Sequence, residues 1–432
     1  MRVIGMDVHR SFAATAVLED GRLRKGERVE LRHDRLLAWA GSLRPDDEVV
    51  LEATGNTAAI VRLVAPHVGR VVIANPVQVR AIAWAKVKTD QIDAATLAKL
   101  HASGFLPEVW APDEDTQALR RRVAERARLV SHMVRLKNRV HAVLHANLIP
   151  RYEGKLFSKG GRAWLAGQPL PEDQRQSVLR HLAEHDRVAA DLAAVDKALA
   201  KWALGEERVR RLMTIGGVNA VVAVSVLAAV GDIARFPSPQ KLVGYLGLDP
   251  RVRQSGERPA FHGRISKQGR SHARAMLVEA AWSAASGPGP LRAFFLRVKD
   301  RRGHQVAAVA TARKLAVLVW HLLSRGEDYA FARPALVAWK LRGLELAAGM
   351  PSRRGGSGPG PARDYSLTAV RDRERQAMET AEQEYRTVHR GLAEAAAGGA
   401  HGRRERGATV VRLRGGTSTP RPALRHAVTR AR

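Results

Sequence analysis

The sequence predicts an α/β domain followed by a mostly α-helical region, and three observations support this. Short apolar segments with the spacing of strands alternate with helical segments through residues 1–112. Beyond residue 113, apolar residues recur every three or four positions among many Arg and Lys. The 432 residues are enough for two or three domains with a sizeable core. We therefore expect a mixed sheet covered by helices, and a helical region after it.

The first predicted domain covers residues 1–112. Residues 2–8 and 12–18 alternate as paired strands do, and Asp20-Gly21 has the composition of a turn. Three strands followed by alternating helices and strands are typical of a mixed α/β sheet. The expected strands are 2–8, 12–18, 26–31, 48–53 and 70–74, and the expected helices are 33–42, 57–66, 76–86 and Asp90 to about Ser103.

The second predicted region, residues 113–205, contains two long amphipathic helices. One begins near Asp115, the other covers 172–204, and a Gly-containing insert at 151–170 separates them. This pattern predicts a helical hairpin or coiled coil that links domains and supports self-association. Because the heptads are imperfect, a helical bundle is an open alternative.

The third predicted region, residues 206–335, is mostly helical and contains Ile215-Gly216-Gly217-Val218 between two helices. This turn resembles the hairpin of helix-hairpin-helix modules, in which backbone N–H groups meet phosphate oxygens. A tight turn without a ligand explains the glycines equally well. The last region, 336–432, is rich in Arg and Gly; we expect a helix around 367–396 and disorder elsewhere in it.

Composition favours a polyanionic partner. Lys plus Arg number 72 against 42 Asp plus Glu, which gives a formal net charge of +30. Such an excess also arises from an Arg-rich genome, but this magnitude is typical of nucleic-acid binding. The absence of cysteine excludes disulfides, thiolate catalysis and cysteine-ligated zinc. No signal peptide and no apolar run near the roughly 18 residues of a membrane span are visible, so we expect a cytoplasmic, nucleoid-associated bacterial protein with no membrane contact.

Four acidic residues have the placement of a metal-dependent nuclease site. Asp7 lies on the first predicted strand, Glu52 ends the fourth, and Asp90 and Asp93 begin a helix on one face. Taken singly, Asp90 is explained by an N-cap and Asp93 by the helix dipole. Together, the four carboxylates suit Mg²⁺ or Mn²⁺ and phosphoryl transfer. A sugar-kinase fold also begins with a strand and an Asp, but the glycine-rich phosphate loop it requires is missing here.

A second candidate site lies in residues 242–282, where glycines break the chain into short turns. Ser255 precedes a glycine on a predicted exposed loop, and cations near a serine stabilise an attacked phosphate. Ser-Gly in a loop is also a common turn. Ser266 competes for the nucleophilic role, although its context favours a helix N-cap. The predicted nucleic-acid contacts here and at the glycine turn are Gly216, Gly217, Arg251, Arg253, Arg258, Arg264, Lys267, Arg270 and Arg274.

These segments resemble the DEDD-type transposases of insertion sequences. The motifs are GMDVH, LEATGN, KTDQIDAATLA, the IGGV turn, FPSPQKLVGYLGLDPR and SGERPAFHGRISKQGR, and the similarity runs from about residue 2 to about residue 335. This chain departs from the family pattern at Ala273, where Leu is usual, a change expected to affect packing only. The region after 351 has no counterpart in the family.

The resemblance implies a ribonuclease-H-like (RuvC-like) first domain in which Asp7, Glu52, Asp90 and Asp93 bind Mg²⁺ or Mn²⁺. It places the family's serine on Ser255, which would attack a DNA phosphate and hold it as a phosphoserine in a composite site shared between protomers. It further implies that the long helices form a dimerisation coiled coil, giving a homodimer or tetramer. A structured non-coding RNA, the bridge RNA, would pair with donor and target DNA and so determine sequence choice.

Three functions are therefore considered. The first is a transposase or recombinase that uses a covalent serine intermediate. The second is a hydrolytic junction-resolving nuclease, in which Ser255 is an ordinary turn residue. The third is a non-catalytic RNA- or DNA-binding protein, which has little reason to keep four carboxylates among so many cations.

Overall fold

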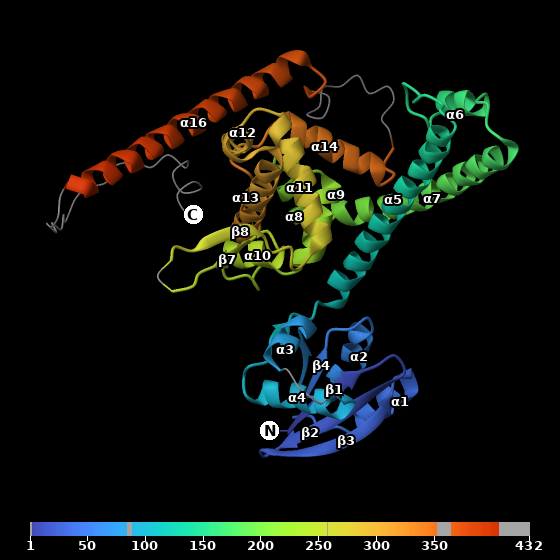
Figure 1. Ribbon diagram of the computed structural model, residues 1–432, viewed down its shortest axis with the longest axis vertical. Helices are drawn as coiled ribbons and strands as arrows, with labels where there is room; N and C mark the ends of the chain where they lie inside the picture. The colour runs from blue at the N-terminus through green and yellow to red at the C-terminus, as the bar shows by residue number, and fades with distance from the viewer. Residues whose placement is uncertain (1, 84–88, 257, 352–363, 406–432) are drawn as a thin grey trace. The chain divides into compact units, whose positions relative to one another are not determined.

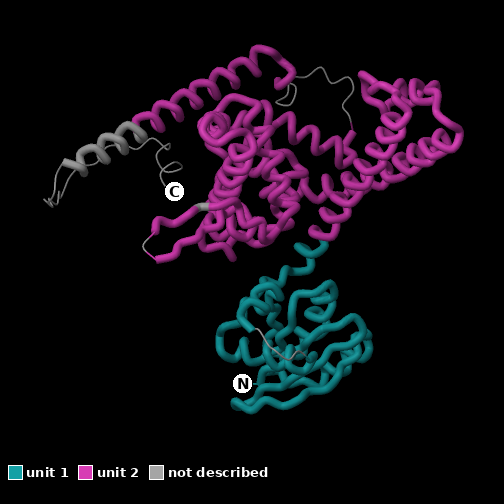
Figure 2. Tube along the Cα trace, in the orientation of Figure 1, with its two compact units in different colours: residues 1–118 teal, residues 119–432 magenta. Residues whose placement is uncertain are grey.

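A computed structural model describes residues 2–83, 89–256, 258–351 and 364–405. The chain forms two compact units, Met1–Ala118 and Leu119–Arg432 (Figure 2). The disorder expected for parts of 336–432 concerns segments that lie largely outside the described residues.

Unit 1 is built on a six-stranded mixed sheet with the order β3-β2-β1-β4-β5-β6. Its first four strands are labelled in Figure 1. The first three strands are antiparallel, β1, β4 and β5 are parallel, and the short β6 is antiparallel to β5. The predicted mixed sheet is thus confirmed. Its strands are β1 Arg2–Val8, β2 Phe12–Glu19, β3 Arg22–Glu30, β4 Glu48–Glu52, β5 Arg70–Ala74 and β6 Glu108–Val109.

Helices cover both faces of this sheet. One face packs Ile4, Met6 and Leu51 against α1 (His33–Gly41) and α2 (Thr57–Val64), which a 3-10 turn, η1 (Ala65–His67), follows. The other face packs Val3 and Val50 against α3 (Pro76–Ile82) and α4 (Asp90–Ala102). The alternation of apolar residues along β1 explains this division, because successive side chains point to opposite faces. The predicted helix 76–86 ends at Ile82, and its last residues fall partly outside the described range.

Unit 2 begins with the two predicted amphipathic helices, α5 (Glu114–Ala146, whose first turn belongs to unit 1) and α7 (Glu172–Leu204). The insert between them contains α6 (Lys159–Ala166) and packs with the ends of both helices around a small apolar cluster that includes Val140, Leu165 and Val178. Along the pair, Arg126 Nε lies 2.5 Å from Asp196 Oδ1. The helical hairpin is therefore closed by its own insert.

The rest of unit 2 packs helices around the buried α9 (Ala220–Val230), whose residues from Val222 to Val230 are all buried. The main core joins this helix to α8, α10, α11 and α13. A two-stranded hairpin, β7–β8, separates α10 from α11. The remaining bounds are α8 Glu207–Met213, α10 Pro239–Tyr245, β7 Pro250–Arg253, β8 Phe261–Ile265, α11 Ser271–Ser286, α12 Pro290–Arg302, α13 His304–Arg325, α14 Pro334–Ala347 and α16 Thr368–Glu405.

Helix α13 corrects one prediction from the sequence. It is 22 residues long and apolar enough, by length and composition, to cross a membrane, so the statement that no segment approaches such a span was wrong. One helix of this kind is weak support for a membrane span, because core helices pass the same test. Here Ala308, Leu315 and Val319 of α13 are buried within unit 2.

Candidate active site

The first candidate site lies where β1 and β4 end. The two strands are parallel, with Met6 paired to Leu51, so Asp7 and Glu52 occupy the next position on neighbouring strands. Met6 and Leu51 face the core that contains α1 and α2. Since side chains alternate along a strand, Asp7 and Glu52 belong to the opposite face, which α4 covers.

Helix α4 brings the other two acids to the same edge. It begins at Asp90, and Thr89 is its N-cap, since Thr89 Oγ1 accepts a hydrogen bond from Ile92 N at 3.3 Å. The capping role considered for Asp90 was therefore wrong, and its carboxylate is available for another purpose. Asp90 and Asp93 both lie in the first turn, where the helix dipole favours negative charge.

Gly5 explains how α4 reaches β1. A Cβ atom at this position would lie 1.9 Å from Ala94 O, so only glycine permits this approach. Ala94 and Ala98 on the facing side of α4 are fully buried. Two small residues and one glycine thus set the distance at which the first turn of α4 meets the end of β1.

His9 joins this site, although it was not among the residues predicted from the sequence. Its Nε2 lies 3.1 Å from Asp7 Oδ2 and 3.3 Å from Asp90 Oδ2. One ligand atom from each of Asp7, His9 and Asp90 falls within 4.8 Å of the others. The His9 ring stacks on Phe12 with centroids 4.6 Å apart, and this contact orients the imidazole. The two-residue spacing from Asp7, which in an extended segment puts both side chains on one face, was the available signal.

The carboxylates of this group have the electrostatic properties expected of a cation-binding site. Burial raises the pKa of Asp7, the His9 imidazole opposes this rise, and the nearby Asp93 and Asp90 carboxylates add to it. Asp93 is therefore close enough to influence Asp7, although it is not in the three-residue group. Glu52 is also outside that group, and its place beside Asp7 follows from the strand register alone. The oxygen-rich set, with one imidazole nitrogen, fits a hard divalent ion such as Mg²⁺ or Mn²⁺.

The second candidate site is the β7–β8 hairpin. Ser255 lies in the connection between the strands, is exposed, and precedes Gly256, which has φ +58°. In the described part of the chain, the Ser255 hydroxyl has no hydrogen-bond partner. A serine without a base is a weak nucleophile. Four of the predicted cations, Arg251, Arg253, Arg258 and Arg264, are exposed on this hairpin, and the exposed Lys267 follows it with φ +57°.

The competing serine has a structural role. Ser266 Oγ donates to Asp249 Oδ1 at 2.6 Å, and Ser266 N donates to Asp249 O at 2.8 Å. These bonds close the base of the hairpin. Ser266 is not a helix N-cap, as its context suggested, because α11 begins at Ser271. The error arose because the segment before α11 forms left-handed turns at Lys267 and Gly269 instead of the first turn of the helix.

Arg270 and Arg274 differ from the other predicted contact residues. Both are half-buried and bind within unit 2. Arg270 Nε donates to Tyr245 OH at 2.7 Å, and Arg274 Nη1 donates to Leu246 O at 2.9 Å. The cost of burying a guanidinium is offset by such hydrogen bonds. Their intramolecular role was not predicted, because charge alone does not distinguish a buried arginine from a surface one.

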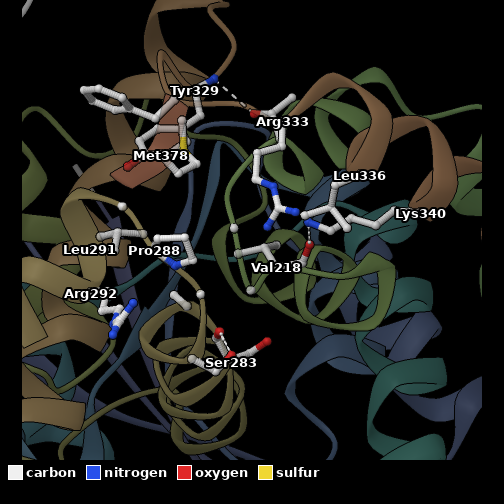
Figure 3. A pocket seen from close by; sticks show the side chains of 18 of the residues that line it. Val218, Ser283, Pro288, Leu291, Arg292, Tyr329, Arg333, Leu336, Lys340 and Met378 are labelled. Atoms are coloured by element: carbon white, nitrogen blue, oxygen red, sulfur yellow. Dashed lines mark hydrogen bonds between the residues drawn. The ribbon is translucent and has the colours of Figure 1, made fainter. Parts of the chain in front are cut away.

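The glycine turn between α8 and α9 lines a cavity of about 360 Å³. Gly217 has φ +87°, and a Cβ atom there would lie 2.5 Å from Ala280 O, so this glycine is required for packing on α11. Lys340 Nζ donates to Met213 O, Ile215 O and Val218 O at 2.8, 3.0 and 2.9 Å. Figure 3 shows Val218 and Lys340 on one side of the cavity and Met378 of α16 on another.

Two family profiles match the chain. A DEDD transposase profile of the IS110 type matches residues 4–148, which include the four predicted acids. The profile described as the transposase IS116/IS110/IS902 family matches residues 209–295, which include Ser255. The chain belongs to the DEDD-type transposases of insertion sequences. The resemblance inferred from its motifs is thereby confirmed.

Curated relatives agree with this family assignment. A putative transposase y4qE of Sinorhizobium fredii is 34% identical over 46% of this chain and 48% of its own, so the chain spans about half that relative's length. The transposase for insertion sequence element IS1111A of Coxiella burnetii is 28% identical over 56% of this chain and 68% of its own. A pilin gene-inverting protein of Moraxella bovis is 24% identical over 65% of this chain and 81% of its own.

Proposed function

We propose that this transposase cuts and rejoins DNA to mobilise an insertion sequence, and that Asp7, Glu52, Asp90 and Asp93 bind Mg²⁺ or Mn²⁺ for this purpose. The observation that supports the proposal most is the approach of Asp7, His9 and Asp90 to one another at the edge where β1 ends. When bound, a divalent ion stabilises negative charge on the phosphoryl oxygens during transfer. The match of residues 4–148 to the DEDD profile supports a ribonuclease-H-like assignment for the sheet.

His9 has a defined task in this proposal. Its Nε2 lies within 3.3 Å of both Asp7 and Asp90, so a protonated imidazole compensates the two carboxylates. A neutral imidazole instead offers the same nitrogen as a ligand. In either state His9 orients the Asp7 and Asp90 carboxylates, and its stacking on Phe12 fixes the ring.

Ser255 is proposed as the nucleophile of the strand-transfer step. Its hydroxyl oxygen forms a bond to phosphorus and releases its proton, while one bond from phosphorus to a deoxyribose oxygen breaks and that oxygen takes up a proton. The phosphodiester energy is kept in the phosphoserine, so a second deoxyribose hydroxyl rejoins the strand without an external energy source. The exposed cations of the hairpin would stabilise the attacked phosphate.

A hydrolytic nuclease is the second candidate, and one observation favours it. The acidic group is assembled within unit 1, whereas the Ser255 hydroxyl has no base among the described residues. Water activated at a metal would then replace the serine, and cleavage would leave no covalent intermediate.

Trapping the intermediate distinguishes the two functions. The full chain, together with the RNA that co-purifies with it, is incubated with DNA carrying the element's ends. The mixture is then denatured and tested for a protein–DNA adduct. We expect an adduct with the wild type and with Ser266→Ala, and none with Ser255→Ala, while DNA binding is equal in all three. Cleavage without an adduct, or recombination by Ser255→Ala, would exclude the covalent route.

The partners are proposed from charge and from the family. The excess of 30 positive charges supports binding to donor and target DNA and to a structured guide RNA. A homodimer or tetramer is proposed through the α5–α7 pair, and a cytoplasmic, nucleoid-associated location follows from the substrate. Sequencing the RNA that co-purifies with the protein tests the guide: enrichment of one transcript from the element supports it, and bulk cellular RNA alone contradicts it.

A further inference from the structure

A cluster of cationic and polar side chains lies between α12, α13 and α16, away from the sites already described. Arg297 of α12 has its Cζ 5.4 Å from the Phe294 ring and 5.8 Å from the Tyr385 ring. Lys314 Nζ of α13 lies 5.5 Å from the same Phe294 ring. On α16, the Tyr385 and His389 rings are 4.3 Å apart. The consecutive helices α12 and α13 and the more distant α16 thus direct hydrogen-bond donors to one place.

Several of these donors are buried and have no partner. Arg297 Nε, the Tyr385 hydroxyl and His389 Nε2 are each inaccessible to solvent and make no hydrogen bond among the described residues. Tyr385 is only 7% exposed, so its hydroxyl has no route to bulk water. An unpaired buried donor destabilises the folded state, and three in one place are uncommon in a native fold.

No carboxylate in the described parts of unit 2 neutralises the two cations. Glu382 of α16 instead accepts from Gly289 N at 3.0 Å and from Arg386 Nη2 at 2.5 Å. Glu374 accepts from Ala335 N at 2.7 Å and from Arg333 Nε at 3.3 Å. These two acids of α16 therefore have other partners.

Electrostatic repulsion is evident within the cluster. Burial lowers the pKa of Lys314, and the Arg297 guanidinium lowers it further. Burial also lowers the pKa of His389, with Arg297 and Lys314 adding to the effect. Two cations and a third group that resists protonation share a region of low dielectric, which is unfavourable unless a negative charge is present.

We propose that Arg297, Lys314, Tyr385 and His389 form a binding site for a phosphate group. A tetrahedral oxyanion accepts several hydrogen bonds from different directions and carries the charge that the two cations lack, and Arg and Lys both bind phosphate in this way. The phosphate could be inorganic or part of a nucleic-acid backbone, which share the same chemistry. The inorganic case does not depend on the proposed transposase activity.

A phosphate bound at such a site would help to hold α16 in place. Arg297 and Lys314 come from the two packed helices α12 and α13, whereas Tyr385 and His389 come from α16, which packs on α12 (Figure 1). A phosphate bound to both sets would attach α16 to the body of unit 2. The alternative is that the Phe294 and Tyr385 rings alone stabilise the cations.

Thermal unfolding of the full chain in EDTA tests the proposal with inorganic phosphate, compared with chloride at equal ionic strength. We expect a saturable rise in Tm with phosphate. Arg297→Met and Lys314→Met should weaken the apparent affinity at least tenfold, and Tyr385→Phe severalfold. Arg301→Met, an exposed arginine on the same helix, is the matched control and should behave as the wild type.

The Tm in phosphate-free buffer distinguishes the two explanations. If the cations lack a partner, Lys314→Met relieves repulsion and raises Tm without phosphate while abolishing the rise with it. If aromatic contacts suffice, Lys314→Met lowers Tm in both buffers, and the proposal is wrong. Stabilisation by a short single-stranded DNA but not by inorganic phosphate, lost in Arg297→Met, assigns the site to a nucleic-acid backbone. Stabilisation by neither, or an equal loss in Arg301→Met, overturns the site.

Discussion

The acidic group of unit 1 and the serine hairpin of unit 2 are built in different ways. Asp7, Asp90 and His9 are positioned by a parallel strand pair, a capped helix and a ring stack, all supported by buried residues. Ser255 lies in an exposed connection between two short strands, and only the base of that hairpin is held by Ser266 and Asp249. The fold therefore preorganises the acids, whereas Ser255 is exposed and its hydroxyl has no hydrogen-bond partner among the described residues.

The largest effect should come from removing one of the proposed metal ligands. Asp7→Asn keeps the volume of the side chain but loses a negative charge at the centre of the group. Because even residues that only support metal ligands often contribute 10–100-fold, we expect strand exchange to fall by more than about 100-fold. The measurement is recombination of a plasmid substrate at several Mg²⁺ concentrations.

Asp20→Asn is the matched control, since Asp20 lies in the β2–β3 turn with φ +50°, a conformation that Asn also adopts. Its activity should equal that of the wild type. Full activity of Asp7→Asn would show that the acidic group is not catalytic and would remove the contrast between the two regions.

A smaller effect should follow from changing the packing that supports the acids. In Gly5→Ala, the new methyl group meets Ala94 O at 1.9 Å unless α4 moves away from β1. We expect a loss of about 1–3 kcal/mol in the free energy of unfolding of unit 1 and reduced activity, although all four acids are retained. Denaturant unfolding followed by circular dichroism measures the first quantity.

Gly41→Ala serves as its control, because no atom lies within 4 Å of a Cβ atom at that helix position. Its stability should stay within about 1 kcal/mol of the wild type or improve. If Gly5→Ala were equally harmless, the position of α4 would not determine the geometry of the site.

The smallest effect concerns the hairpin cations. Arg253 is exposed on β7, so Arg253→Gln should weaken nucleic-acid binding only severalfold and reduce the slope of log affinity against log salt by about 1. Fluorescence anisotropy over a salt series gives both numbers. The exposed Arg180 of α7 provides the comparison, and Arg180→Gln should leave the slope unchanged. Identical slopes for both variants would mean that the hairpin is not a contact surface.

The sequence predicted most of unit 1, and the physical reason is local. Strand alternation, turn composition and helix starts depend on neighbouring residues, so β5 was predicted at its observed bounds and α4 began at Asp90. The meeting of Asp7 and Asp90 was predicted in outline because both lie at the ends of regular elements.

What the sequence could not predict depends on contacts between distant residues. Lys340 binds three carbonyl oxygens more than 120 positions away, and no periodicity indicates this. Arg270 and Arg274 have the same charge as Arg251 but are half-buried, because α10 and the segment after it supply their acceptors. Ser266 was misassigned because a left-handed turn at Lys267 is rare for a residue other than glycine.

The role of Lys340 also determines how the protein can be divided. The family profile of the serine-bearing region ends at residue 295. A fragment ending there would lose the ammonium group that satisfies Met213 O, Ile215 O and Val218 O, together with α13, which completes the core around α9. A truncated protein meant to fold alone should therefore extend past Ala347, the last residue of α14.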